Sequence, residues 1–194
     1  MMEKIEQLDQ ELFLWLNNLH HGIFDVVMYY VTNKYFWIPF YLFIIFAVVV
    51  KFKKQAFFII PILILTVTIC DQITSGFMKP FFERLRPCHD PIIGNLVHLV
   101  VDGCGGKFGF ASSHASNHFG LATFLWLLFR NTYKWAHLIF IWAFLIAYSR
   151  VYVGVHYPGD ILVGSLVGII IGWLCFQIMK GVLKKFNTEL VRSS

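Results

Sequence analysis

The amino-acid sequence is dominated by long apolar segments that are separated by small groups of charged residues. Five such segments occur, and a single carboxylate, Asp71, interrupts one of them. A membrane-spanning helix needs about 20 mostly apolar residues, so these segments have the composition and approximate length of membrane spans. The first is short, and we expect it to borrow residues from 26–33. We expect spans at Tyr35–Val50, Gln55–Met78, Phe108–Phe129, Trp135–Ser149 and Ile161–Met179.

Composition supports a membrane protein and excludes an ordinary soluble domain. Hydrophobic residues make up 58% of the chain and charged residues only 14%, whereas soluble domains carry about 25% charged residues. The net charge is +5, but the basic residues do not form the dense patch that nucleic-acid binding requires. We predict an all-α, polytopic helical bundle in a lipid bilayer, with residues 1–194 forming one membrane domain and having no nucleic-acid partner.

The segment before the first span carries an amphipathic pattern. Apolar residues recur at three- and four-residue spacing between Ile5 and Leu19, with acidic residues on the other side. We expect residues 1–33 to contain a helix that either lies in the membrane interface or packs on the bundle, and that carries no chemistry. Residues 1–20 are too polar for a cleavable signal peptide, so insertion is expected to use the internal spans.

The orientation is predicted from the distribution of Lys and Arg between the two sides of the membrane. One set of connections carries nine of these residues and the other carries seven. If three of the seven serve a functional site, four basic residues remain on that side of the membrane, compared with nine on the other. Cytoplasmic loops are enriched in positive charge, so the side with four is expected to lie outside. We therefore expect a multi-pass protein of the cytoplasmic (inner) membrane, with its amino terminus and its site facing the periplasm or cell exterior.

Two of the four cysteines, Cys88 and Cys104, lie in the long connection on the predicted outer side. An oxidising compartment would let them form a disulfide, which we favour over two free thiols. A further alternative is a metal site that includes neighbouring polar residues, but no familiar zinc spacing is present. The residues of that alternative are Cys88, His89, Asp90, His98 and Cys104.

Three polar segments at the predicted outer ends of spans carry the candidate chemistry. The first, Lys79–Pro87, follows the second span and places Lys79 and Arg86 seven residues apart. On a helix this separation is close to two turns, so both side chains would point the same way and could hold one anion between them. By itself the segment would also fit a basic cluster that binds lipid headgroups.

The second segment, Phe110–Gly120, is a turn of small residues that leads into the third span. Small side chains let backbone amides approach a ligand, and the N-terminus of a helix binds phosphate. His114 lies at the mouth of this span, although a lone histidine at a membrane interface is more often structural.

The third segment, Ser149–Asp160, joins the fourth and fifth predicted spans. His156 and Asp160 are four residues apart, a spacing at which the carboxylate can orient the imidazole and leave its other nitrogen as a base or nucleophile. Arg150 adds a permanent planar cation suited to phosphate oxygens. Such polar residues are costly at the edge of an apolar chain unless they serve a function.

Together the three segments predict phosphoryl transfer without a metal or other cofactor. Two arginines and a lysine supply positive charge for the non-bridging oxygens, one histidine attacks phosphorus, and the other protonates the leaving oxygen. No Walker loop is present, and the glycines of 102–109 lack the strand-to-helix context of a dinucleotide site.

These segments resemble the signature of the type 2 phosphatidic acid phosphatase family, which is related to the vanadium haloperoxidases. That signature consists of Lys, six residues, Arg-Pro; then Pro-Ser-Gly-His; then Ser-Arg, five residues, His, three residues, Asp. The first and third parts are complete here, in Lys79–Pro87 and Ser149–Asp160. Residues 111–114 are Ala-Ser-Ser-His, and this departure matters because Ser tolerates a positive φ less well than Gly.

The resemblance, which covers residues 79–160, implies a role for each matching residue. His156 would be the nucleophile that forms a phosphohistidine, with Asp160 orienting it, and His114 would be the general acid. The family also implies a helical bundle with its site near the outer membrane–water interface. The phosphate-binding residues would be Lys79, Arg86, Ser112, Ser113 and Arg150, with Ser113 acting chiefly through its backbone.

A site at the ends of membrane spans favours a lipid phosphate or diphosphate over a soluble ester. The five spans and the amphipathic segment are similar to bacterial undecaprenyl-diphosphate phosphatases, so undecaprenyl diphosphate is the expected substrate. Lipid A phosphatases and phosphatidylglycerophosphate phosphatases share the motifs and are the alternatives. A catalytically silent membrane scaffold or polyprenyl-phosphate carrier fits less well with both histidines and Asp160, and a vanadate-using haloperoxidase fits less well with the membrane spans.

Overall fold

The structure, a computed structural model, describes the backbone of residues 2–193 and the side chains of residues 3–186. Within these residues the fold is all-α and contains no strand, and Leu85 and Phe108 form an isolated bridge. The helices are α1 (Met2–Asn17), α2 (Gly22–Thr32), α3 (Ile38–Phe52), α4 (Ala56–Asp71), α5 (Lys79–Phe82), α6 (Ser113–Phe129), α7 (Ile139–Tyr152) and α8 (Pro158–Ser193). Shorter helical segments are Lys53–Gln55, Gln72–Met78, Pro87–His89, Gly94–Leu96 and Lys134–Leu138.

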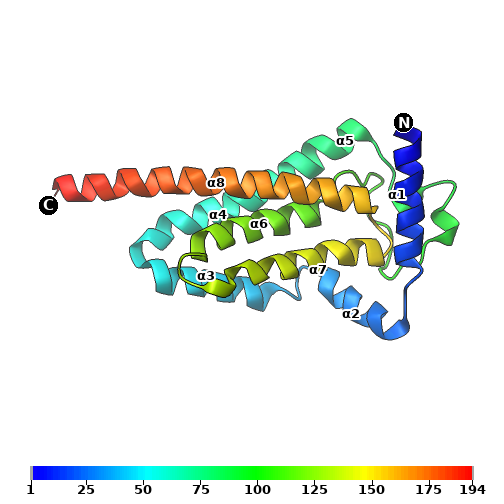
Figure 1. The fold of residues 1–194 in the computed structure, drawn as a ribbon, viewed down its shortest axis with the longest axis horizontal. Helices are drawn as coiled ribbons and strands as arrows, with labels where there is room; N and C mark the ends of the chain where they lie inside the picture. Colours follow the sequence, from blue (N-terminus) through cyan, green and yellow to red (C-terminus); the bar gives the residue numbers. More distant parts are fainter. Residues whose placement is uncertain (1, 194) are drawn as a thin grey trace.

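The described helices form a membrane bundle. Three continuous helical stretches, Ile38–Phe82, Lys134–Tyr152 and Pro158–Phe186, are long and apolar enough to cross a bilayer. The first contains both α3 and α4, which are antiparallel and meet at the turn Lys53–Gln55 (Figure 1). Large apolar side chains on these helices face outward, as a lipid environment requires. They include Phe43, Phe46, Phe57, Phe144, Leu162 and Ile170.

Helix α6 lies in the middle of the bundle, against α4, α7 and α8 (Figure 1). Gly164, Gly168 and Gly172 repeat every four residues along α8, and a Cβ at any of them would overlap a carbonyl oxygen of the segment from Ser112 to the middle of α6. Small residues at this spacing let two membrane helices approach closely. The approach brings the start of α8 to the start of α6, where Ser112 N donates to Asp160 O at 3.0 Å.

Helix α1 crosses the end of the bundle at which α7 ends and α8 begins (Figure 1). Phe13 is fully buried and packs edge-on against Tyr157, with 5.4 Å between the ring centroids. The helix therefore packs on the bundle, which is one of the two arrangements that the sequence allows. Its amphipathic face nevertheless points away from the bundle and stays exposed. The exposed residues of this face are Ile5, Leu8, Leu12, Trp15 and Leu19.

Two predicted boundaries of spans are wrong. The first span does not borrow residues 26–33, because residues 26–32 belong to the separate helix α2 and Asn33 caps its end. In the turn that follows, Trp37 Nε1 donates to Val31 O at 2.8 Å. The third predicted span corresponds to α6, which begins at Ser113 and not at Phe108. The residues before it are held in a loop, because Gly109 N donates to Arg84 O at 2.8 Å.

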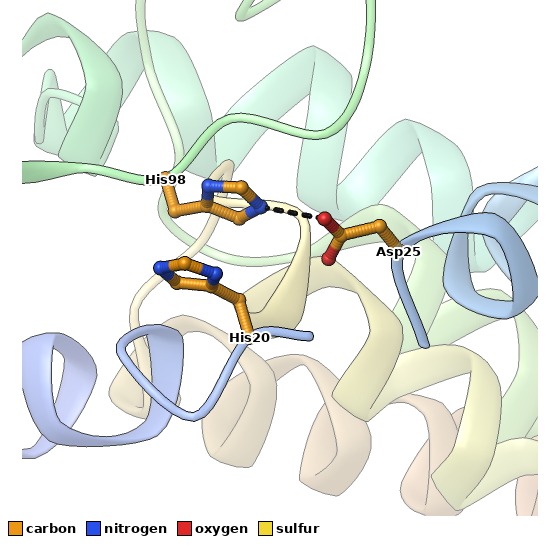
Figure 2. A group of neighbouring side chains, drawn as sticks. All are labelled: His20, Asp25 and His98. Atoms are coloured by element: carbon orange, nitrogen blue, oxygen red, sulfur yellow. Dashed lines mark hydrogen bonds and ion pairs between the residues drawn. The ribbon is translucent and has the colours of Figure 1, made fainter. Parts of the chain in front are cut away.

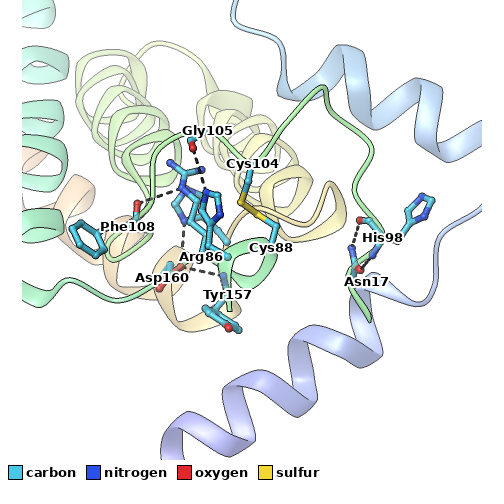
Figure 3. Close-up of a disulfide and its surroundings, with 11 residues drawn as sticks. Asn17, Arg86, Cys88, His98, Cys104, Gly105, Phe108, Tyr157 and Asp160 are labelled. Carbon is cyan, nitrogen blue, oxygen red and sulfur yellow. Dashed lines mark hydrogen bonds and ion pairs between the residues drawn. A yellow bond between two sulfur atoms is a disulfide. The ribbon is translucent and has the colours of Figure 1, made fainter. Parts of the chain in front are cut away.

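Cys88 and Cys104 are joined in a disulfide that closes the loop following Arg86 (Figure 3). Their Cα atoms are 6.0 Å apart and their separation in sequence is 16 residues. Both sulfur atoms are therefore occupied, and the metal site considered from the sequence, which needed these cysteines as ligands, does not exist in this arrangement.

Candidate active site

A cavity of about 600 Å³ brings the three polar segments of the sequence together. Of the eight residues predicted to act on a phosphate, six line this cavity, while Ser112 and Asp160 are fully buried outside its lining. The segments come from three parts of the chain, namely α5 with the loop after it, the start of α6, and the end of α7 with its connection to α8. The six lining residues are Lys79, Arg86, Ser113, His114, Arg150 and His156.

From these polar residues the cavity continues between α3 and α4 into an apolar part. Figure 1 shows the two helices diverging from their connecting turn. Ile45 and Ile64 line the cavity and are also 38% and 57% exposed, so the cavity reaches the outer surface of the bundle. A ligand with an anionic headgroup and an apolar tail would match both parts. The other apolar lining residues are Ile44, Leu63, Val67 and Leu121.

Three cations face the polar part of the cavity and leave room for an anion. The Nζ of Lys79 donates to Ser113 Oγ at 3.0 Å. Arg86 is 9% exposed, and Arg150 donates from Nη1 to Thr32 Oγ1. The Nε of Arg150 is buried and has no hydrogen-bond partner among the described residues. Because an unpaired buried donor is costly, a bound anion would stabilise this arrangement.

His156 and Asp160 form the buried pair that their spacing predicts. Nδ1 of His156 lies 3.2 Å from Asp160 Oδ2, which also accepts from the backbone N of Tyr157 at 3.1 Å. The other carboxylate oxygen, Oδ1, accepts from Arg84 Nη1 at 2.9 Å. A carboxylate that accepts the Nδ1 proton fixes the tautomer of the imidazole, so the lone pair is on Nε2. Figure 3 shows Asp160 beside Arg86 and Tyr157.

His114 lies in the first turn of α6 and lines the cavity. Its carbonyl oxygen is 2.7 Å from Nδ1 of His118, whose Nε2 is 3.0 Å from Tyr41 Oη. These contacts join the start of α6 to α3, so the position of His114 depends on the packing of both helices.

The small-residue turn forms the N-terminus of α6. Ser112 is the N-cap, and its Oγ accepts from Ala115 N at 3.5 Å. Ser113 is the first residue of the helix, so its backbone is helical and the position does not need the positive φ that would favour Gly. Its hydroxyl contacts Lys79 and also lies 2.6 Å from Ser75 Oγ. The first backbone N–H groups of α6 therefore lie at the polar part of the cavity, where an anion would bind.

The prediction that Lys79 and Arg86 share one helix is wrong. Helix α5 ends at Phe82, and Glu83 has a left-handed backbone with φ 48°. Arg86 then lies in an extended segment whose backbone N donates to Lys107 O at 3.2 Å. Both side chains still reach the same cavity, because the loop folds back over the end of the bundle.

The positive surroundings favour a neutral imidazole at His156. Burial lowers the pKa of His156 well below its usual value of 6.5, and the charges of Arg86, Arg150 and Lys79 lower it further. Burial also lowers the pKa of the Arg86 guanidinium. For Arg84, burial lowers the pKa, but Asp160 and Asp9 outweigh this effect and raise it. Arg84 therefore stays protonated, and His156 keeps the lone pair that attack on an electrophile requires.

Sequence reasoning missed Arg84 and Asp9. Arg84 lies inside the first motif but between its defining residues, and its Nη2 donates to Asp9 Oδ2 at 2.8 Å. Asp9 also accepts from Gly159 N at 2.8 Å, which attaches α1 to the first turn of α8. The prediction that the amphipathic segment carries no chemistry is therefore incomplete, because α1 contacts a residue that holds Asp160. No pattern in the sequence links these distant positions.

The model of the PAP2 superfamily matches residues 59–184, which include all three motifs. The chain belongs to the PAP2 superfamily. Among its relatives, the lipid A 4'-phosphatase of Bacteroides thetaiotaomicron is 39% identical over 97% of this chain and 84% of that protein. An undecaprenyl-diphosphatase of Sulfolobus acidocaldarius is 29% identical over 93% of this chain and 83% of that protein. The crystal structure of Aquifex aeolicus LpxE has a TM-score of 0.61 and 27% identity, covering 86% of this chain and 93% of that one.

As a PAP2 member this chain is a membrane-bound lipid phosphatase, which confirms the family expected from the three motifs. The matched region begins inside α4 and leaves α1, α2 and α3 outside it. Helix α3 nonetheless contributes to the site, because its residues Tyr41 and Ile45 line the cavity.

Proposed function

We propose that this PAP2 protein hydrolyses the phosphate monoester of a lipid A-type glycolipid. The observation that carries the proposal is the single cavity that joins three cations to an apolar part open between α3 and α4. Such a cavity accommodates a phosphate at the membrane surface while the acyl chains of the same molecule remain in the bilayer. The resemblance to a lipid A 4'-phosphatase, at 39% identity over 97% of the chain, supports this substrate over the undecaprenyl diphosphate expected from the sequence. An undecaprenyl-diphosphatase that aligns over 93% of the chain is 29% identical.

The polar lining next to the phosphate position also favours a sugar headgroup. Asp71 and Ser75 line the cavity, and Ser75 Oγ lies 3.4 Å from Asp71 Oδ1. A carboxylate accepts hydrogen bonds from the hydroxyl and amide groups of an acylated amino sugar. The same carboxylate repels the second phosphate of a diphosphate. Asp71 therefore favours a glycolipid monophosphate over a polyprenyl diphosphate.

In the proposed mechanism the phosphoryl group is transferred twice. Nε2 of His156 attacks phosphorus as the bond from phosphorus to the sugar oxygen breaks, and His114 donates a proton to that oxygen. Water then attacks the phosphohistidine while His114 accepts a proton from it, which releases inorganic phosphate and restores both histidines. The products are phosphate and the dephosphorylated lipid.

Charge on the non-bridging oxygens is stabilised by groups that are already in position. Lys79, Arg86 and Arg150 supply three cations, and the N-terminus of α6 supplies backbone N–H donors near Ser113. Preorganised donors of this kind stabilise a transition state more than water does, because they need not reorient. We therefore expect turnover without added metal.

We further propose that the site faces the periplasm or cell exterior in the inner membrane. The turns that carry the basic groups of residues 51–54 and 130–134 lie at the end of the bundle opposite α1 (Figure 1). The disulfide between Cys88 and Cys104 lies at the same end as the site and favours an oxidising compartment.

The test is a phosphate-release assay on purified protein in detergent. The substrates are a lipid A 4'-monophosphate, undecaprenyl diphosphate and phosphatidylglycerophosphate, each assayed with EDTA and with orthovanadate. We expect the glycolipid to be hydrolysed with the highest kcat/KM, inhibition by vanadate as a mimic of five-coordinate phosphorus, and no loss with EDTA. His156→Ala should be inactive, whereas the control His137→Ala, at an exposed position of the segment Lys134–Leu138 that precedes α7, should be active. A preference for undecaprenyl diphosphate would contradict the substrate, and loss of activity in EDTA would contradict the mechanism.

A further inference from the structure

Three metal-ligating side chains converge on the bundle outside the active-site cavity. His20 follows α1, Asp25 lies on α2, and His98 lies in the loop that the disulfide closes. One ligand atom from each residue lies within 4.8 Å of those from the other two. Figure 2 shows the rings of His20 and His98 stacked, 3.8 Å between centroids, with a nitrogen of each on the side of Asp25.

The donor set and its spacing suit a transition-metal ion. Nε2 of His98 is 3.0 Å from Asp25 Oδ2, and two ligands of one tetrahedral zinc ion would be about 3.3 Å apart for metal–ligand bonds of about 2.0–2.1 Å. Two imidazoles and one carboxylate are typical ligands of Zn²⁺, whereas Mg²⁺ and Ca²⁺ prefer oxygen ligands alone. The side chains of His98 and Asp25 are 31% and 24% exposed, so an ion can reach them from solvent.

The surrounding residues hold two of these ligands in position. Tyr152 Oη donates to Asp25 Oδ1 at 2.8 Å, which leaves Oδ2 facing His98. Asn17, which is 2% exposed, accepts from His98 N at 2.8 Å and donates to His98 O at 3.0 Å. Figure 3 shows this pair of contacts. Outer hydrogen bonds of this kind orient the ligands of a metal and increase its affinity.

We propose that His20, Asp25 and His98 bind one divalent transition-metal ion of the zinc type, with a water molecule at the fourth position. None of the three residues lines the phosphate cavity, so the ion is not part of the phosphatase chemistry. Its role is to join the connection between α1 and α2, the helix α2, and the disulfide-closed loop.

The ion would also hold that loop against a catalytic segment. A Cβ added at Gly154 would lie 2.7 Å from His98 O, so the backbone of His98 packs directly on the turn between Arg150 and His156. Gly154 has a φ of 86°, which an L side chain rarely adopts. Fixing His98 therefore raises the thermal stability of this part of the fold, whereas the two hydrogen bonds with Asn17 hold the His98 backbone against the turn without the ion, so turnover is not expected to need it.

The experiment measures zinc binding by tag-free protein in detergent. Metal is removed with a chelator, and ZnCl₂ is then titrated by calorimetry with a parallel measurement of Tm. We expect one Zn²⁺ per chain and a rise in Tm, because an ion that binds only the folded state stabilises it. Three variants should each weaken zinc binding at least about tenfold, namely His20→Ala, Asp25→Asn and His98→Ala. Loss of a residue that only hydrogen-bonds to a metal ligand already lowers metal affinity by about tenfold, so loss of a ligand should lower it at least as much.

The matched control is His89→Ala, an exposed histidine of the same disulfide-closed loop. It should bind zinc like the unchanged protein. His20 is exposed, so its replacement leaves the fold intact and isolates the ligand effect. In Co²⁺-loaded protein the visible spectrum should indicate four-coordination and should be lost in His20→Ala. No saturable binding by the unchanged protein, or equal affinity in all four variants, would overturn the proposal.

Discussion

Arg84 Nη1 donates to Asp160 Oδ1 at 2.9 Å, on the side of the carboxylate opposite to His156. The Asp160 side chain is fully buried and that of Arg84 is 19% exposed. Arg84 also forms an ion pair with Asp9 at 2.8 Å and lies over the ring of Tyr157. The carboxylate that orients the proposed nucleophile is therefore itself fixed by a positioning residue that is attached to α1.

Arg84→Ala should lower kcat by about 10- to 100-fold, because a hydrogen bond to a charged group contributes about 1.5–3 kcal/mol and each 1.36 kcal/mol is a tenfold change in rate. KM should change little, since Arg84 does not line the cavity. Arg84→Lys should restore part of the rate. Steady-state kinetics on the proposed glycolipid substrate check this.

The control for Arg84 is Lys107→Ala, an exposed cation on the neighbouring loop. It should retain the kcat of the unchanged protein. An unchanged kcat in Arg84→Ala, or an equal loss in the control, would show that Arg84 does not position Asp160.

The membrane helices and the set of residues around the cavity could be predicted from the sequence. Apolar intervals between charges locate α3, α4, α6, α7 and α8, because hydrophobic length is a local property. The ends of these helices are less well predicted, since α8 continues to Ser193, beyond the predicted end at Met179. The spacing of His156 and Asp160 predicts their contact for the same reason, since four residues span one helical turn.

The contacts between distant segments could not be predicted in this way. The pairs Arg84–Asp9 and Asn17–His98 join residues 75 and 81 positions apart, and only the packing of α1 across the bundle brings them together. The left-handed backbone at Glu83 could not be predicted from the sequence either, because a non-glycine residue at positive φ has no reliable sequence signal. Helix periodicity therefore placed Arg86 on the wrong element, although its side chain lines the same cavity as Lys79.

His114→Ala should slow an alkyl phosphate much more than an aryl phosphate. General acid catalysis contributes about 100- to 10,000-fold, and an aryl leaving oxygen needs little protonation. Rates of phosphate release from a matched pair of alkyl and aryl esters measure the difference. If His114 instead binds the non-bridging oxygens, both esters slow equally, and that result would reject its role as the acid.

The acid side of the pH profile should reflect the lowered pKa of His156. A group with a lowered pKa stays neutral as the pH falls through 6.5, the usual value, so the nucleophile remains competent there. We expect kcat/KM, corrected for the ionisation of the substrate phosphate by ³¹P NMR, to stay level through pH 6.5 and to fall only in more acidic solution. A fall centred at pH 6.5 would mean that the surroundings of His156 do not disfavour its protonation.

The disulfide gives a test of orientation and of stability. Cys88 and Cys104 should resist thiol labelling until reductant is added, and their joint replacement by Ser should lower the free energy of unfolding by about 3 kcal/mol. A protease site inserted at Gly94 should be cut from outside intact cells. As the control, the same site inserted at Lys53–Gln55, at the opposite end of the bundle, should be cut only after lysis. The reverse pattern would place the active site in the cytoplasm.

The most direct measurement of the central claim is a rapid-quench experiment with a ³²P-labelled glycolipid phosphate. Reaction for a fraction of one turnover, followed by an alkaline quench and peptide mapping, should give a base-stable, acid-labile label on the peptide that contains His156. The label should be absent from His156→Ala and should accumulate in His114→Ala with an aryl ester if His114 also assists attack by water. Turnover by His156→Ala, or a label on a different residue, would contradict the account.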